Sequence, residues 1–413
     1  MVKDGYKQTD IGVIPEDWKV KKLSESFEFK NGLNKAKEFF GHGTPIVNYM
    51  DVFNYYGLKK EDIIGKVEVT NDELKNYNVK KGDVFFTRTS ETVDEIGISA
   101  VIIENTDNTV FSGFILRARP IDEFYNLNYK KYCFLSKEVR KQITSTSSYT
   151  TRALTNGKLL SNISIAIPPI EEQKAIATVL SDTDELINSL EKLISKKEAI
   201  KTATMQQLLT GKKRLDGFSG EWEEKKFGDI GQSIIGLTYK PENISDFGTL
   251  VLRSSNVQNN RLLFKDNVYV NMDLPKRIIV EKDDILICVR NGSRRLIGKC
   301  ALIDDKTVGQ AFGAFMLVFR TKFAHYVFYQ FQSNMILKQI EETMGATINQ
   351  ITNKDMASFS ILMPFEEAEI NAITSVLTEM DKELKLLKTR LEKIKAIKEG
   401  MMQELLTGRT RLI

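Results

Sequence analysis

Polar and basic side chains gather in loops that follow β-rich stretches in both halves of this 413-residue sequence. Arg88-Thr89-Ser90 follows one such stretch, and the run 290–295 (Arg-Asn-Gly-Ser-Arg-Arg) follows the matching stretch in the second half. An Arg guanidinium can bind guanine O6 and N7 or a phosphate, an Asn amide can bind adenine, and Gly lets the backbone approach closely. Such loops indicate a surface that binds nucleic acid.

Further loops at matching places carry groups of the same kind. The polar stretch 144–152 parallels 344–350, 31–35 parallels 236–240, and the aromatic-rich 48–56 parallels 253–258. The candidate DNA-binding residues are Asn31, Lys35, Asn48, Tyr49, Arg88, Thr89, Ser90, Ser147, Tyr149, Arg152, Tyr239, Lys240, Arg253, Asn256, Arg290, Asn291, Ser293, Arg294, Arg295, Thr347, Asn349 and Gln350. Any one of them, taken alone, is more simply a residue of a solvated loop. Their parallel placement in both halves favours DNA.

Motifs for catalysis are missing from the sequence. It contains no Walker A pattern, no GxGxxG after a strand, no HExxH and no Asn-Pro-Pro-aromatic run. Only two histidines and three scattered cysteines are present, which argues against a zinc site or a disulfide scaffold. The net charge of +4 excludes a highly basic, histone-like binder. We therefore expect no catalytic residue, no metal site and no cofactor in this chain.

An internal duplication organises the chain. At a constant offset of about 197 residues, the segment 172–215 aligns without gaps with 369–412, and about 19 of about 44 positions are identical. The rest of each half matches more weakly, for example Trp18 with Trp222. The plan is variable–constant–variable–constant, with segments 1–165, 166–215, 216–362 and 363–413. We interpret each variable segment as an α+β domain built on a twisted sheet.

The constant segments predict two long helices. Residues 172–209 contain neither Pro nor Gly, and about 38 helical residues give a rod of roughly 57 Å. Apolar residues recur at alternating spacings of three and four, which is typical of a coiled coil. The predicted seam consists of Val179, Leu186, Leu190, Leu193, Ile200, Met380, Leu384, Leu387, Leu391 and Ile394. The simplest partner for each stripe is its duplicate; packing on its own variable domain or on another copy of the chain is the alternative.

With these features the chain resembles the specificity (S) subunits of type I restriction-modification enzymes. The resemblance rests on the run 167–173 (Ile-Pro-Pro-Ile-Glu-Glu-Gln), the Leu-Leu-Thr-Gly sequences at 208–211 and 405–408, and the opening 14–18 (Ile-Pro-Glu-Asp-Trp). It covers essentially the whole chain. The second copy departs from the pattern at 364–370, which lacks the Glu-Gln pair.

The resemblance implies a division of labour. Each variable segment would be a target recognition domain that reads one half of a bipartite, asymmetric site in double-stranded DNA. The two helices would pair antiparallel in a pseudo-twofold arrangement and act as a ruler near one turn of DNA. They would dock methyltransferase subunits, expected to be two, which carry S-adenosylmethionine, and indirectly the restriction subunits, which use ATP and Mg²⁺. The target adenines would flip into those partners, and this chain would not be an enzyme.

The start of the sequence is polar, without a signal peptide, and no apolar run approaches about 20 residues, so we expect a cytoplasmic protein without a membrane partner. Two other functions remain open at this point. The first is a structural adaptor whose coiled coil recruits partners and whose domains bind protein or glycan. The second, a self-contained DNA enzyme, is disfavoured because the sequence has no cofactor or metal motif.

Overall fold

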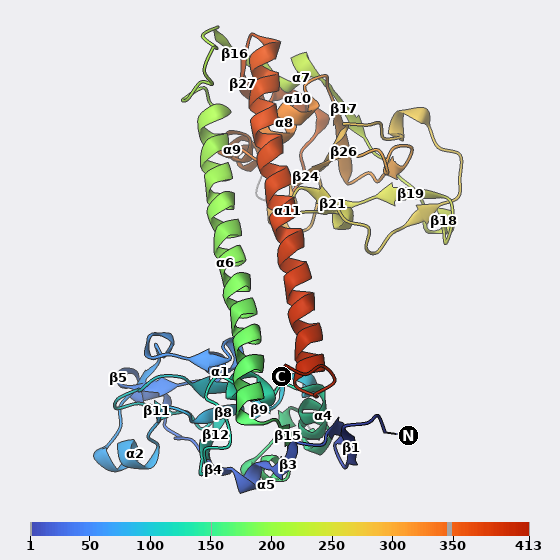
Figure 1. Ribbon diagram of the computed structural model, residues 1–413. Helices are drawn as coiled ribbons and strands as arrows, with labels where there is room; N and C mark the ends of the chain where they lie inside the picture. Colours follow the sequence, from blue (N-terminus) through green and yellow to red (C-terminus); the bar gives the residue numbers. More distant parts are fainter. Residues whose placement is uncertain (1, 150, 345–348, 413) are drawn as a thin grey trace. The chain divides into compact units, whose positions relative to one another are not determined.

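The computed structural model describes residues 2–149, 151–344 and 349–412 (Figure 1). The chain divides into two compact units. Unit 1 comprises residues 1–191 and 389–413, and unit 2 comprises residues 192–388. Each division falls inside a long helix, so each unit contains one globular domain and one part of each helix.

Unit 1 is built on a five-stranded sheet in the order β4-β12-β8-β10-β6, mostly antiparallel. Two three-stranded sheets, β11-β5-β7 and β13-β14-β9, and two pairs, β1-β2 and β15-β3, complete it. The strands are β1 Tyr6–Thr9, β2 Gly12–Pro15, β3 Lys19–Lys22, β4 Phe27–Asn31, β5 Phe40–Val47, β6 Gly57–Leu58, β7 Lys66–Val67, β8 Val84–Thr87, β9 Thr89–Ser90, β10 Ser99–Ile102, β11 Val110–Phe111, β12 Ile115–Pro120, β13 Ser148–Tyr149, β14 Ala153–Leu154 and β15 Ser164–Ile167. The helices are α1 Tyr49–Asn54, α2 Asn71–Asn76, α3 Lys130–Cys133, α4 Lys137–Thr146 and α5 Gly157–Ser161, with 3₁₀ turns η1 Leu23–Glu25, η2 Lys37–Phe39, η3 Lys60–Asp62 and η4 Val93–Glu95.

Unit 2 repeats this plan with a four-stranded sheet, β17-β26-β23-β24, beside a second one, β18-β22-β19-β25. The strands are β16 Trp222–Lys226, β17 Gln232–Ile235, β18 Ile244–Ser245, β19 Thr249–Leu252, β20 Val257–Gln258, β21 Arg261–Leu262, β22 Tyr269–Val270, β23 Ile285–Cys288, β24 Cys300–Leu302, β25 Ala311–Phe312, β26 Met316–Arg320 and β27 Ser360–Pro364. The helices are α7 Phe227–Ile230, α8 Ala324–Gln330, α9 Asn334–Thr343 and α10 Asn353–Ser358, with 3₁₀ turns η5 Pro241–Asn243, η6 Ser254–Asn256, η7 Lys276–Ile278 and η8 Arg294–Leu296. The α+β class expected for both domains is confirmed.

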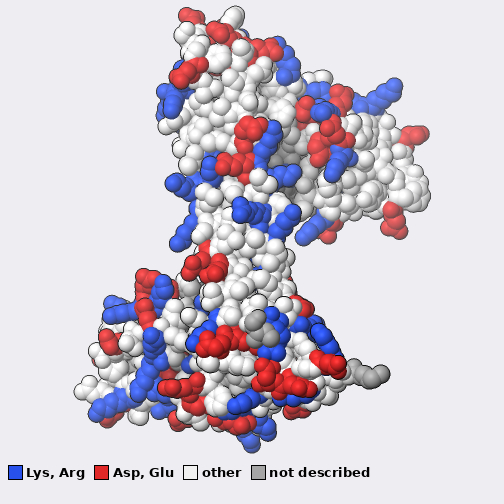
Figure 2. Space-filling view, in the orientation of Figure 1, with Lys and Arg blue, Asp and Glu red and all other residues white. Residues whose placement is uncertain are grey.

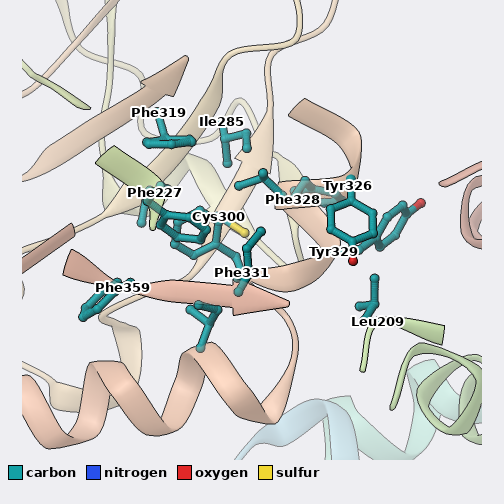
Figure 3. Packing of buried hydrophobic residues seen from close by; sticks show 14 of the residues in the cluster. Leu209, Phe227, Ile285, Cys300, Phe319, Tyr326, Phe328, Tyr329, Phe331 and Phe359 are labelled. Atoms are coloured by element: carbon teal, nitrogen blue, oxygen red, sulfur yellow. The ribbon is translucent and has the colours of Figure 1, made fainter. Parts of the chain in front are cut away.

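The central strands are almost entirely apolar because both of their faces are covered. All four residues of β8 and all four of β23 are buried. In unit 2, aromatic rings from α7, β26 and α8 pack together on one face of the sheet, where Phe227 lies 5.1 Å from both Phe319 and Phe331 between ring centroids (Figure 3). Such covered sheets give the loops at their strand ends a rigid support.

The two predicted long helices are confirmed. α6 spans Ile170–Leu208 and α11 spans Glu367–Leu405, each with 39 residues and hence a length of about 58 Å. Within each unit the helices pair antiparallel. In unit 1, Asp184 forms an ion pair with Lys398. Glu191, which follows Asp184 in α6, forms an ion pair at 2.8 Å with Lys395, which precedes Lys398 in α11. In unit 2, Lys197 pairs with Glu383, and the later residue Lys201 pairs with the earlier residue Asp381. In both units the partner's number falls as the α6 number rises, as expected for antiparallel helices.

The residues of the predicted seam differ in their burial. Leu190, Leu384 and Leu391 are buried, and Val179, Met380, Leu387 and Ile394 are half-buried. Leu186, Leu193 and Ile200 were assigned wrongly, because 37%, 38% and 41% of their surfaces are exposed. Leu180 and Ile194, on the neighbouring stripe, are buried instead. Successive residues point about 100° apart around a helix, so two adjacent stripes cannot both face one partner.

A buried polar clasp closes each unit. In unit 1, Arg411 donates two hydrogen bonds to Glu172, at 2.7 and 2.8 Å, and the indole of Trp18 donates to the same carboxylate at 2.9 Å. In unit 2, Arg214 binds Glu369 in the same bidentate way, at 2.5 and 2.6 Å, and its guanidinium lies over the ring of Trp222. The start of each long helix is thereby tied to the end of the other.

The Leu-Leu-Thr-Gly sequences end the long helices. Gly211 and Gly408 have φ of +68° and +70°, the left-handed conformation that glycine favours after a helix. A Cβ on Gly408 would lie 3.2 Å from the Trp18 ring and 2.5 Å from Pro15, so a side chain does not fit there. After these turns the chain places Arg214 beside Glu369 and Arg411 beside Glu172.

A second polar contact fastens each domain to its helix pair. The hydroxyl of Tyr132 donates to Asp184 at 2.7 Å, and the ammonium of Lys398 lies over the Tyr132 ring. In unit 2, Tyr329 donates to Asp381 at 2.9 Å, and Lys201 lies over its ring. Figure 3 shows Leu209, the residue after α6, near Tyr329 in the same cluster. None of the described helices is long and apolar enough to cross a membrane.

Candidate nucleic-acid interface

In unit 1 the predicted loops converge at the ends of neighbouring strands. β9, which contains Thr89 and Ser90, pairs with β14, and β14 pairs with β13, which contains Tyr149. Two loops distant in the sequence thus form one small sheet. Tyr49, at the start of α1, joins them through a shared cavity of about 380 Å³. The cavity is lined by Tyr49, Met50, Phe53, Thr89, Ser90, Glu91, Glu95, Phe114 and Arg152.

Unit 2 brings its predicted loops together in the same way. Arg290 and Gln350 form an antiparallel bridge, and the amide of Asn349 donates to the carbonyl of Gly292 at 3.2 Å. The amide of Asn291 donates to the hydroxyl of Ser254, in the loop after β19, at 3.0 Å. Each unit therefore joins three separate loops at one place.

Backbone hydrogen bonds define which positions correspond. The Thr155 amide donates to the Arg88 carbonyl at 3.0 Å, and the Ile351 amide donates to the Val289 carbonyl at 2.8 Å. Arg88 therefore corresponds to Val289, and Arg290 corresponds to Thr89. By the same comparison Asn48 corresponds to Arg253, since β5 and β19 pair alike with β11 and β25.

The loops at 31–35 and 236–240 lie against the turn that leads into β12 or β26. Leu33 bridges to Ser112, and Leu237 bridges to Gly313. This approach requires glycine beside it, because a Cβ on Gly32 would lie 2.1 Å from the Ser112 carbonyl oxygen. The predicted residues Asn31, Lys35, Tyr239 and Lys240 are thus held near the other loops of their own units.

Several cations at these loops are free to bind a ligand. Arg152, Arg290 and Arg295 are exposed, and none of their guanidiniums has a hydrogen-bond or ion-pair partner among the described residues. The Arg290 guanidinium lies 5.1 Å from the centroid of the Phe315 ring, which orients it. Figure 2 shows basic and acidic side chains interspersed over the visible face, so the attraction for a polyanion is local to such loops.

Other predicted residues build the framework. Asn256 is fully buried; its side chain accepts from the Arg253 amide at 3.0 Å and donates to the Leu263 carbonyl at 3.0 Å. We therefore correct the expectation that Asn256 contacts DNA. In unit 1 Asp51 takes the equivalent place, accepting from the Asn48 amide at 2.7 Å, and burial raises the pKa of its carboxyl.

Further predicted residues are engaged within their own units. Lys35 pairs with Glu73 at 2.8 Å, and this pairing lowers the pKa of Glu73. Ser90 is buried and donates to Glu95 at 3.1 Å. Arg294 donates to the Glu341 carbonyl at 3.0 Å, which leaves it less free than its neighbour Arg295. Three more predicted residues form hydrogen bonds to neighbouring residues. The Ser147 hydroxyl donates to the Thr144 carbonyl, and the Arg253 guanidinium donates to the Asp266 carbonyl. The backbone amide of Ser293 donates to the Asn291 side chain. Thr347 lies outside the described residues.

Two phenylalanines at the centre of these loops were missed as site residues. Phe114 is 60% exposed and Phe315 is 56% exposed, at equivalent positions of the two units. Exposed Met50, beside Phe114 in the cavity, was also missed. The sequence signal was present, because Phe114 and Phe315 align in the duplication, but an aromatic residue at the start of a strand is more often core than surface.

Comparison with known proteins finds similar sequences over nearly the whole chain. The sequence model described as "Type I restriction modification DNA specificity domain" matches residues 15–202 and 219–396. The putative type I restriction enzyme MjaX specificity subunit of Methanocaldococcus jannaschii is 28% identical, covering 99% of this chain and 97% of that protein. The MjaVIII specificity subunit of the same organism is 23% identical over the same shares. The solved S subunit of a type I restriction-modification system from M. genitalium has a TM-score of 0.58 at 16% identity, covering 94% of this chain and 96% of that one. This last similarity concerns the fold.

Proposed function

The chain belongs to the type I restriction modification DNA specificity family, and we propose from this premise that it selects the DNA sequence for a type I restriction-modification complex. The observation that carries the proposal is the convergence of three loops in each unit around an exposed Phe and free guanidiniums. Arg side chains on a rigid loop framework are suited to phosphates and to the edges of bases.

Each unit reads one half of a split site in this proposal. The loop framework is shared, while the side chains it presents differ at equivalent positions, such as Thr89 and Arg290. A shared framework with different side chains supports two half-sites of different sequence. The residues predicted to bind DNA, apart from Asn256, stay part of the proposal, as does the division into segments 1–165, 166–215, 216–362 and 363–413.

The partners follow from the same premise. Two methyltransferase subunits would carry S-adenosylmethionine and dock on the long helices, and restriction subunits would join through them. Exposed apolar side chains on the helices support a protein partner; they are Leu186, Leu193 and Ile200 on α6, and Leu386 and Ile397 on α11. The chain itself would contribute binding and positioning rather than catalysis, and the complex would work in the cytoplasm.

Methylation mapping with a segment exchange tests this function. The full chain is expressed with its methyltransferase subunits, and the methylated adenines of the host DNA are mapped. We expect a split motif in which replacing 216–362 with the equivalent segment of a relative changes one half only. The reciprocal replacement of 1–165 is the matched control and changes the other half. A contiguous motif, or a single replacement that alters both halves, contradicts the proposal.

A further inference from the structure

The two units present different chemistry on the same loop framework. Tyr49 and Met50 of unit 1 correspond to Ser254 and Ser255 of unit 2, because the parallel pairs β5-β11 and β19-β25 place these loops alike. Exposed Met50 contributes an apolar side chain where unit 2 has a serine. Tyr49 and Phe53 also stack, with ring centroids 5.9 Å apart, and both line the cavity.

The exposed Phe is used differently in the two units. In unit 2 the Arg290 guanidinium lies over the Phe315 ring, at 5.1 Å from its centroid. In unit 1 the equivalent position is Thr89, and within the described ranges no cation stacks on the ring of Phe114. The Phe114 ring is therefore free for an apolar ligand, whereas Phe315 serves as a platform for a hydrogen-bond donor.

Charge separates the two surfaces further. Glu91 and Glu95 line the cavity of unit 1 together with Arg152, so the cavity carries both signs of charge, and the two carboxylates disfavour a phosphate beside them. The loop 290–295 of unit 2 contains three arginines and no acid. The cavity of unit 1 thus suits base edges that offer apolar surface, and the loop of unit 2 suits base edges rich in acceptors.

We propose that unit 1 recognises thymine through its C5-methyl group, using Phe114 and Met50, and that unit 2 recognises guanine through Arg290. In the major groove only thymine carries a methyl group, and only guanine presents both O6 and N7 as acceptors for one guanidinium. The assignment rests on the proposed function, since it names the bases that the same two surfaces read.

Base analogues that change one group at a time test this assignment. Binding is measured for the full chain in complex with its methyltransferase subunits, on duplexes carrying the split motif obtained from methylation mapping. Deoxyuridine replaces thymidine to remove the methyl group, and 7-deazadeoxyguanosine replaces deoxyguanosine to remove N7. Each analogue is placed in one half-site at a time, and the half-sites are assigned to units by the segment exchange.

In the half-site of unit 1 we expect deoxyuridine to weaken binding about fourfold for each contacted methyl group. Phe114→Ala should bind the thymidine duplex more weakly and lose the penalty for deoxyuridine. In the half-site of unit 2 we expect 7-deazadeoxyguanosine to weaken binding about fivefold or more, with the penalty lost in Arg290→Ala. Arg290→Lys is the matched variant that keeps the charge without the planar fork, and should recover only part of the affinity.

The outcomes separate the two levels of the proposal. If no split motif is found, the proposed function fails. If a split motif is bound but deoxyuridine has no effect in the half-site of unit 1, or 7-deazadeoxyguanosine has none in that of unit 2, the function stands and the base assignment is overturned. A penalty that persists unchanged in Phe114→Ala or Arg290→Ala likewise overturns it. Thermal unfolding of each variant identifies a loss that comes from misfolding, and Met50→Ala then provides an independent test in unit 1.

Discussion

Replacement of Glu172 by Gln is expected to destabilise unit 1 strongly. The carboxylate is fully buried and receives two hydrogen bonds from Arg411 and one from the Trp18 indole. A Gln amide offers one acceptor oxygen and turns an NH₂ group towards at least one of these donors. Removing one partner of a buried ion pair costs about 3–5 kcal/mol. We expect the lower end, about 3 kcal/mol, because Arg411 keeps its second partner Asp17 at 2.8 Å.

The assay is thermal unfolding, measured by calorimetry. For a unit of this size, 1 kcal/mol shifts Tm by about 2–4 °C, so Glu172→Gln should melt about 6–12 °C below the parent. Glu171→Gln is the matched control. Glu171 is the adjacent residue in the same first helical turn, so both substitutions lose a similar interaction with the helix dipole. Its side chain is 79% exposed and, among the residues that the structure describes, pairs only with Lys174, so the loss should be under about 1 kcal/mol.

A double-mutant cycle separates the buried pair from other effects. Arg411→Met combined with Glu172→Gln should cost less than the two single losses together, because neither variant group then faces an unpaired charge. Glu369→Gln tests the equivalent clasp with Arg214 in unit 2. If Glu172→Gln melts within about 1 °C of Glu171→Gln, the clasp contributes nothing specific and the reasoning from burial is refuted.

Three further predictions concern the helix seam, the loops and the thiols. Leu190→Ala, at a buried position of α6, should lower the free energy of unfolding in denaturant titrations by about 2–4 kcal/mol. Leu186→Ala, at an exposed position of the same helix, should lower it by under about 1 kcal/mol. Equal losses in the two variants would contradict the observed burial. Arg295→Ala should lower DNA affinity, and if its guanidinium binds a phosphate the slope of log K against log salt should fall by about 0.9; an unchanged affinity at every salt concentration would remove this side chain from the interface. Burial raises the pKa of Cys300 to about 12, and the other two cysteines are also buried, so iodoacetamide at pH 8 should label the native chain little and the unfolded chain fully; rapid labelling of the native chain would show that these sites open.

The long helices and the duplication could be predicted because the signals are local. An uninterrupted run of helix formers determines where α6 begins and ends, whatever its partner is. The choice between adjacent apolar stripes is different. Leu186 and Leu193 lie one heptad apart and Leu180 and Ile194 lie two heptads apart, so both pairs fit the same repeat, and only the packing around the helix decides which pair is buried.

The candidate interface could be predicted as a set of loops but not as an arrangement of side chains. The types of residue in 88–90 and 290–295 indicated their chemistry, yet an irregular loop carries no periodicity, so only the backbone hydrogen bonds show that Arg290 corresponds to Thr89. Asn256 is of a residue type that can contact DNA, yet it is buried, and its side-chain oxygen accepts from the Arg253 amide at the start of its own turn. Phe114 has the composition of a core residue and is exposed.

The sequence by itself determined the internal repeat, the two helices, the α+β class of both domains and the chemical types present in the matching loops, because each of these follows from spacing and composition along the chain. Only the tertiary structure decided which helix stripe is buried, which glutamate each terminal arginine binds, and which loop residues share a cavity. These features depend on contacts between residues far apart in the sequence, and such contacts are settled by packing and by the pairing of buried charges.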